Sequence, residues 1–209
     1  MKKIISVVAL SVLTLSAYAA TKTQTVSDFT QLAVRNGFKV QVNCAKDARV
    51  SMTGTEEGLS TTEVAVHDGT LEIEHQHDFG SNDSVSLVIN TAKPLTLVKV
   101  EDGVALKVAA CAIDPNSVKL LMRNGSKVQL AGKTKSFDLE LSKGATFGSS
   151  GGTFAMDDMH VKGSMGAKVY ACHAKSVTGT LSEGAEIYVP ASANTTGLNL
   201  SWGAQKKDC

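Results

Sequence analysis

Two carboxylates and an imidazole lie close together at Asp157, Asp158 and His160, in the stretch MDDMHVKG. Glycoside hydrolysis needs two carboxylates that face the same bond, roughly 5–9.5 Å apart. Adjacent residues on a β-strand point to opposite faces, so the two aspartates would not face one bond. A corner of the chain, where acidic side chains accept hydrogen bonds from turn amides, explains them as well. We therefore expect no catalytic residue here.

A second candidate site is the pair His75-x-His77, which would place two imidazoles on one face of a strand. Glu72 and Asp78 lie nearby in the sequence. Imidazole suits zinc, copper or nickel, but two ligands are too few for a tight site without a third from elsewhere. We interpret the pair as a solvated strand end and expect neither a bound metal nor another cofactor.

The third candidate is the pair Tyr170 and Tyr188, with Lys168 and Glu186 beside them. Each tyrosine follows a glycine by four residues, so the two segments look like copies of one unit. If they are neighbouring strands about 4.8 Å apart, their rings can stack on the outer face. Exposed aromatic rings on a rigid sheet suit the binding of a sugar ring or an extended peptide. Alternatively, the stacked rings only stabilise the sheet. These four residues form the candidate ligand-binding site.

The tyrosines belong to a repeat of about twenty residues that covers most of the chain. Apolar residues recur three and five positions on either side of a glycine, with mostly polar residues between them. This period of two is typical of β-strands, and no copy has helical periodicity. One block is too short to bury its own apolar face, so the blocks must stack, which predicts a β-solenoid. The aligned glycines are Gly103, Gly125, Gly144, Gly166 and Gly184.

The same register extends to Gly37 near the start of the chain and Gly203 near its end. It places Val128 and Val169 in the core. A solenoid needs a cap over each open end, and we expect Trp202 to lie over the C-terminal end of this core. We thus predict one domain over 20–209, with regular rungs over 96–203.

Residues 43–95 depart from the repeat. The stretch TEVAVHDGTLEIEHQH contains two alternating segments joined by Asp68-Gly69, a strong signal of a β-hairpin. A loop at 79–83 and the strand-like SVSLVIN follow. We interpret this section as antiparallel strands that flank or cap the first rungs.

The four cysteines are Cys44, Cys111, Cys172 and Cys209. Cys111 and Cys172 follow glycines three rungs apart, about 14 Å at the usual strand spacing, which is too far for a disulfide. Cys44 and Cys111 can meet if the first rung stacks directly on the second. That leaves Cys172 with Cys209, which requires the C-terminal tail to fold back.

The N-terminal stretch MKKIISVVALSVLTLSAYAA has two lysines, a short apolar run and small residues before Ala20. This order is typical of a secretory signal peptide spanning residues 1–19. The run is shorter than the roughly 20 apolar residues of a membrane span. The whole chain has 21 Lys and Arg against 20 Asp and Glu, which gives no electrostatic reason to expect nucleic acid or an anionic membrane as a partner. We expect a periplasmic or secreted protein without a lipid anchor.

Taken together, these features resemble the GIN-domain family, also described as auto-transporter adhesin head domains. The resemblance is carried by FTQLAVRNGFKVQV at 29–42, VAVHDGTLEIEH at 64–75 and VSLVINTAKPLTLVKVEDGVALKV at 85–108, followed by the Gly-Ala rungs. It implies an exported, mostly bacterial, all-β protein folded as a right-handed parallel β-helix. The family supplies no catalytic residues to transfer to this sequence.

We therefore predict a non-enzymatic binding or structural module at the cell envelope, with a glycan or an envelope protein as its partner. The first alternative is a carbohydrate-active enzyme, a polysaccharide lyase or hydrolase, on the same scaffold. The second is an assembly subunit that adds strands to the open edge of a partner. Fold alone does not decide among these functions, because function lies in sites carried by the fold.

Overall fold

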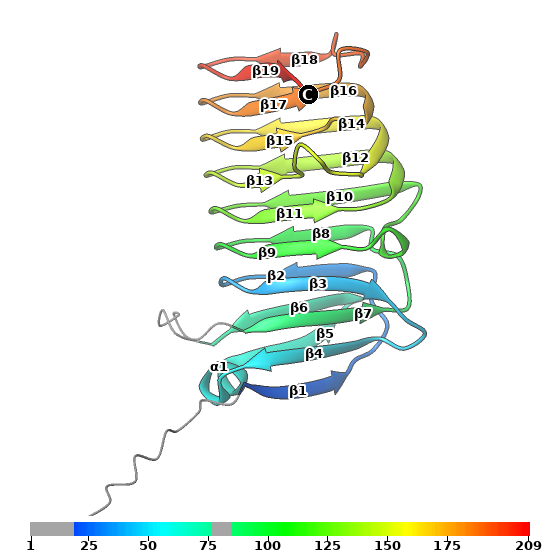
Figure 1. Cartoon of the computed structure of the whole chain (residues 1–209), viewed down its shortest axis with the longest axis vertical. Helices are drawn as coiled ribbons and strands as arrows, with labels where there is room; N and C mark the ends of the chain where they lie inside the picture. The colour runs from blue at the N-terminus through cyan, green and yellow to red at the C-terminus, as the bar shows by residue number, and fades with distance from the viewer. Residues whose placement is uncertain (1–18, 77–84) are drawn as a thin grey trace, which may run out of the picture.

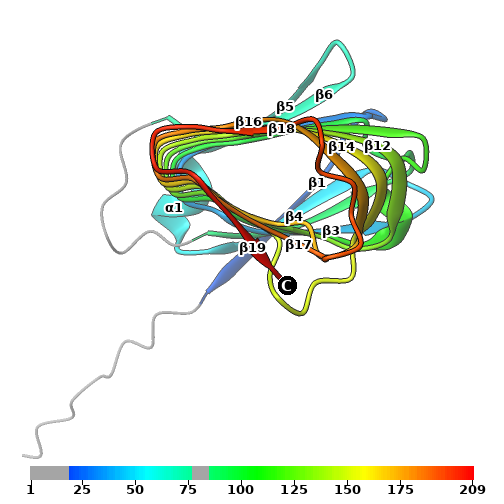
Figure 2. The ribbon, with the colours of Figure 1, turned by 90° about the horizontal axis from the view of Figure 1, so that it is seen from above.

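The computed structural model describes residues 19–76 and 85–209, and the structural statements below refer to those residues. They form a β-solenoid whose two long faces are stacks of mostly parallel strands, sheet A and sheet B (Figures 1 and 2). In spatial order, sheet A contains β1 (Ala20–Thr25), β4 (Arg49–Gly54), β7 (Ser86–Thr91), β3 (Lys39–Cys44), β9 (Ala105–Val108), β11 (Lys127–Leu130), β13 (Thr146–Phe147), β15 (Lys168–Tyr170), β17 (Glu186–Val189) and β19 (Gln205–Asp208).

Sheet B contains, in spatial order, β18 (Leu198–Leu200), β16 (Ala174–Leu181), β14 (Ala155–Gly163), β12 (Lys133–Leu141), β10 (Ser117–Met122), β8 (Leu97–Val100), β2 (Gln31–Val34), β6 (Thr70–His75) and β5 (Thr62–His67). The described residues also include the α-helix α1 (Glu56–Thr61) and a 3₁₀ turn, η1 (Ala110–Ala112). The all-β solenoid predicted from the period-two repeat is confirmed.

Each regular rung consists of a strand of sheet B, a tight corner and a strand of sheet A. At the corner, two consecutive residues have positive φ, for example Asn124 at 51° and Gly125 at 70°. The second residue is a glycine at every such corner, which limits to one residue the cost of placing a side chain in the left-handed region. The corners also bond to one another, since the Gly125 amide donates to the Lys143 carbonyl of the next rung at 2.9 Å. The repeated glycine therefore has a structural role, because it forms the corner of each rung.

The first rung along the chain is not the first in the stack. Strands β2 and β3 lie between the β6–β7 rung on one side and the β8–β9 rung on the other, with parallel pairing on both sides. The predicted hairpin is present, because β5 and β6 pair antiparallel around Asp68 and Gly69. Strands β1 and β4 continue sheet A antiparallel beyond β7. The section at 43–95 thus supplies a parallel rung as well as antiparallel strands, which the alternation alone did not reveal.

The apolar core runs between the two sheets along the length of the stack. Val128 and Val169 are fully buried in it, as the repeat register predicts. Midway along the stack, the rings of Phe137, Phe147 and Phe154 pack with centroids 5.0 to 6.2 Å apart. These contacts join β12, β13 and the loop that follows β13, so the loop is anchored in the core at its far end.

The prediction that Trp202 covers the C-terminal end of the core is wrong. Its φ of 51° places it at a corner directly before Gly203, and its side chain is 85% exposed. It occupies the position that Asn124 holds in an earlier rung, so the side chain points away from the core. Leu200, on the last strand of sheet B, is itself 41% exposed.

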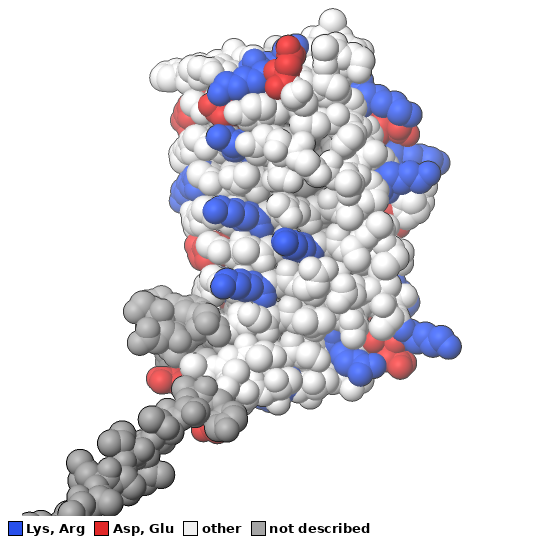
Figure 3. Space-filling view, in the orientation of Figure 1, with Lys and Arg blue, Asp and Glu red and all other residues white. Residues whose placement is uncertain are grey.

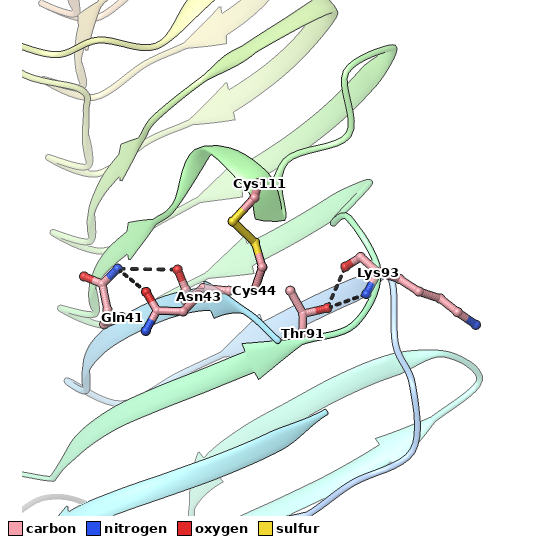
Figure 4. The surroundings of a disulfide bond; sticks show 7 residues. Gln41, Asn43, Cys44, Thr91, Lys93 and Cys111 are labelled. Atoms are coloured by element: carbon pink, nitrogen blue, oxygen red, sulfur yellow. Dashed lines mark hydrogen bonds between the residues drawn. A yellow bond between two sulfur atoms is a disulfide. The ribbon is translucent and has the colours of Figure 1, made fainter. Parts of the chain in front are cut away.

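Both predicted disulfides are present. Cys44 bonds to Cys111 with a Cα–Cα distance of 6.1 Å, and Cys172 bonds to Cys209 at 5.7 Å. The first bond joins the end of β3 to η1, which is possible because β3 lies directly beside β9 (Figure 4). The second ties the strand β19 back to the β15 rung.

Candidate functional site

The tyrosine pair lies on the outer face of sheet A near the C-terminal end. Tyr170 on β15 and Tyr188 on β17 are register partners, and their rings stack at 4.6 Å between centroids with 14° between planes. Both side chains are half-buried. Adjacent strands bring these rings together because each tyrosine occupies the same outward position of its rung. The stacked arrangement expected from the sequence is present.

Glu186 holds the charged residues around this pair together. Its carboxylate accepts hydrogen bonds from Lys207 Nζ at 2.6 Å and from the Tyr188 hydroxyl at 3.2 Å, and it pairs with Lys168 Nζ at 3.2 Å. The bonds from Lys207 and then Lys168 lower the pKa of Glu186 to about 2. The carboxylate is therefore ionised near neutral pH, so the cluster is an ionic support for the ring pair.

A hollow of about 310 Å³ opens directly beside Tyr170. One wall is the loop at 148–154, which leaves β13 and projects outward from sheet A (Figure 2). His173 Nε2 donates to the carbonyl of Gly152 in this loop at 2.9 Å, which ties the loop to the rung above. Tyr170 lies over Gly148, where an added Cβ would come within 2.8 Å of the Tyr170 carbonyl oxygen. The absence of a side chain at Gly148 therefore lets the backbone of Tyr170 approach closely at the edge of the hollow.

The sequence did not reveal this hollow. Its Gly-rich loop was visible as GSSGG, but alternation says only which side chains point outward and nothing about the path of a loop. One feature of the sequence could have indicated the loop. Ser149 occupies the position at which the neighbouring repeats have the apolar residues Leu130 and Ala171, so the repeat is interrupted there.

The expectation that Asp157 and Asp158 point to opposite faces is wrong, because neither aspartate points into the core, and Asp158 shares the exposed face of β14 with His160. Asp157 pairs with Lys175 at 2.7 Å, and the hydrogen bond from that lysine lowers the pKa of the aspartate. A general acid for glycoside cleavage needs a raised pKa. Asp158 lies in register with Ser136 and Ser176 of the neighbouring strands, so no carboxylate flanks it there.

His160 is also exposed on β14, and its Nδ1 lies 3.4 Å from the Thr178 hydroxyl. On the side of the solenoid that holds Asp157, the fold gathers Lys133, Lys135 and Lys175 around a hollow of about 570 Å³. This grouping of lysines was not expected from the sequence. It surrounds Asp157 with positive charge, which favours the carboxylate form and not the proton-donating acid.

The interpretation of His75 as a solvated strand end is wrong. Its side chain is only 7% exposed, and its ring stacks on Phe38 at 4.3 Å. Nδ1 lies 3.3 Å from the Thr61 hydroxyl. Glu72 belongs to the exposed face of β6, opposite His75, so it is not placed to share a ligand with the imidazole. His77 and Asp78 lie outside the described residues.

Within residues 19–76 and 85–209, no three His, Cys, Asp or Glu side chains are grouped as metal ligands. In the same part of the chain, no helix has the length and apolar character needed to cross a membrane. Residues 1–18, most of the predicted signal peptide, lie outside the described residues.

Comparison with known proteins identifies the relatives of this fold. The model of the family described as "Putative auto-transporter adhesin, head GIN domain" matches residues 28–197. A crystal structure of a putative adhesin from Bacteroides fragilis superposes with a TM-score of 0.68 at 10% identity, covering 93% of this chain and 98% of that one. A putative lipid binding protein from Parabacteroides distasonis superposes with a TM-score of 0.52, also at 10% identity, covering 91% of this chain and 96% of the other. At such identities the two structures share the fold with this chain. No curated protein sequence matches it.

Proposed function

The chain belongs to the family of auto-transporter adhesin head GIN domains, and from that premise we propose that it is an exported, non-enzymatic adhesive module that binds its ligand on the outer face of sheet A. The observation that carries the proposal is the stacked pair Tyr170 and Tyr188 at the margin of the hollow beside Gly148. The rings are held by neighbouring strands and by the Glu186 ion pairs, so little side-chain freedom is lost when a ligand packs on them.

Aromatic contacts of this kind contribute about 0.5–1.5 kcal/mol per pair beyond the buried area. That magnitude suits weak attachment that is strengthened by many copies, as in adhesion, more than tight capture of one small molecule. A sugar ring or an extended peptide can pack against the rings of Tyr170 and Tyr188 and extend into the hollow beside Tyr170. The proposal therefore places attachment, and not turnover, at this face.

Changing both tyrosines to Ser is expected to weaken binding roughly two- to tenfold to any ligand found on a glycan and peptide array. The rings would be lost, while the buried core that holds the fold would be untouched. The control is the double change of Tyr170 and Tyr188 to Phe, which keeps both rings and should keep most of the binding. Equal binding by the Ser and Phe variants, with both folded by circular dichroism, would place the ligand elsewhere.

Export is the second part of the proposal. Two disulfides support it, because such bonds persist in oxidising compartments. The first strand also begins at Ala20, directly after the expected cleavage position. Protein recovered from the periplasm or the medium of a producing bacterium is expected to begin at Ala20 on N-terminal sequencing. Recovery of the uncleaved chain from the cytoplasm, with reduced cysteines, would contradict export.

The competing function is carbohydrate cleavage at Asp157, Asp158 and His160. It is disfavoured by the lysine partner of Asp157 and by the absence of a carboxylate in register beside Asp158. We expect no release of reducing sugar from any bound polysaccharide. Sugar release by the unaltered protein that disappears in Asp158→Asn, with Tyr170 and Tyr188 dispensable, would establish an enzyme instead.

A further inference from the structure

Three lysines on the middle of sheet A have no acidic partner. Lys39 on β3, Lys107 on β9 and Lys127 on β11 are exposed, and none forms an ion pair with any residue the structure describes. Lys39 and Lys127 both align with Ala105 from opposite sides, and Lys107 lies two residues further along that middle strand. Figure 3 shows lysine and arginine atoms repeated one above another on this face of the molecule. The three cations thus form a staggered row across successive rungs.

Elsewhere on the two sheets, some basic side chains are neutralised, whereas others, such as Lys99, Lys133 and Lys135, form no ion pair in the described structure. On sheet B, Lys119 pairs with Asp138 and Glu140, each at 3.4 Å. On sheet A near the C-terminal end, Lys168 and Lys207 share Glu186. The outward positions of β3, β9 and β11 contain no Asp or Glu at all. The three lysines of this face therefore have no carboxylate beside them on their own strands, and the near-zero net charge of the chain does not reveal this local excess of positive charge.

The same face is hollowed. A depression of about 550 Å³ runs over β7, β3, β9 and β11, and it shares Gln41, Lys107, Gln129 and Gly148 with the hollow beside Tyr170. The two depressions therefore make one groove along the solenoid axis. Its floor includes Val88, an apolar side chain that is 42% exposed. Its end is formed by Tyr170 and the loop at 148–154.

We infer that this groove binds a linear acidic polysaccharide, a chain of uronic acid residues lying across the rungs. The inference rests on the proposed function and names the class of its ligand. The charges are complementary, because the lysine row offers unpaired cations to carboxylates that repeat along a polymer. The rungs repeat about every 4.8 Å, so an extended polymer meets a new rung with each short step. Gln41 and Gln129 can donate to and accept from hydroxyl groups. Tyr170 offers a ring face at the end of the groove.

The test measures binding of labelled polygalacturonate to residues 20–209 in low-salt buffer. A groove variant combines Lys39→Gln, Lys107→Gln and Lys127→Gln. It is expected to bind roughly tenfold more weakly, given surface ion pairs of about 0.2–1 kcal/mol each.

The control variant combines Lys46→Gln, Lys99→Gln and Lys143→Gln. These lysines are also exposed and form no ion pair in the described structure, but they lie outside the groove. It loses the same net charge and should bind like the unaltered protein. Salt at about 1 M, where the Debye length is about 3 Å, should abolish most of the difference.

Equal weakening of both variants would overturn the inference, because net charge alone would then explain binding. Two further probes separate the remaining outcomes. Binding of neutral dextran that requires the tyrosines but not the groove lysines would leave the proposed function standing and reject the acidic ligand. Binding of phosphatidylglycerol vesicles through the groove lysines, without polygalacturonate binding, would replace the polysaccharide by a membrane surface and overturn the inference. Failure of polygalacturonate, dextran and the full array to bind would reject both proposals.

Discussion

Replacing Val128 or Val169 by Asp is expected to lower the free energy of unfolding by about 3–5 kcal/mol. Both side chains are fully buried between the two sheets. Val128 lies in register with Leu106 and Phe147 on the neighbouring strands, so an aspartate there would have only apolar neighbours on its own sheet. A buried carboxylate without a partner either unfolds its surroundings or takes up a proton, and both cost stability. The measurement is the midpoint of unfolding in urea.

Gln129→Asp is the matched control for Val128→Asp. Gln129 is the next residue on β11, and its side chain is exposed. The same carboxylate placed there stays in water, so we expect a change within about 0.5 kcal/mol. If the two substitutions had equal effects, the assignment of inward and outward positions would be wrong throughout the repeat.

Gly179→Ala is expected to destabilise the protein by about 3 kcal/mol or more. Gly179 lies on β16 in register with Val161, and a Cβ at this position would be 2.0 Å from the Val161 carbonyl oxygen. That oxygen belongs to the backbone of the next strand, so it moves only if the sheet moves. The φ of 120° adds a conformational cost for any residue with a side chain. Thermal unfolding of the purified variant measures the loss.

Gly184→Asn separates the clash from a general intolerance of glycine replacement. Gly184 also has positive φ, at 72°, but an added Cβ would meet no atom within 4 Å. Asn enters the left-handed region more readily than most residues, so a cost of about 1 kcal/mol is expected. A larger loss for Gly184→Asn than for Gly179→Ala would contradict the explanation by close backbone contact.

The rungs were predictable because their signal is local. Inward and outward positions alternate along each strand, and the corner glycine recurs once per rung, so the burial of Val128 and Val169 follows from short stretches of sequence. The disulfides followed from the same register together with rung spacing. The ring stack of Tyr170 and Tyr188 was predictable for the same reason, because equivalent positions of adjacent rungs are neighbours.

What the sequence did not reveal depends on contacts between distant segments. The insertion of the β2–β3 rung between β6–β7 and β8–β9 leaves every local pattern unchanged. The environment of His75 depends on Phe38, which lies in a different rung. Trp202 lies at a corner of the last rung, and the presence of a large aromatic residue near the C-terminus did not indicate that its side chain would be exposed. One end of the groove is formed by the loop at 148–154, whose path the alternation does not indicate.

The two disulfides decide how this protein would carry mechanical tension, which an adhesive module meets whenever the surfaces it joins are pulled apart. Force passing along the backbone crosses from Cys44 to Cys111 and from Cys172 to Cys209, so residues 45–110 and 173–208 are shielded from extension. The shielded part includes β7 and β9, two of the strands that line the groove, but not β3 or β11. Pull from the N-terminal side first reaches β1, an edge strand that pairs only with β4. It then reaches β2 and β3, which are hydrogen-bonded on both edges. Peeling that begins at β1 is therefore resisted at the β2–β3 rung, where two sets of strand pairs must break at once.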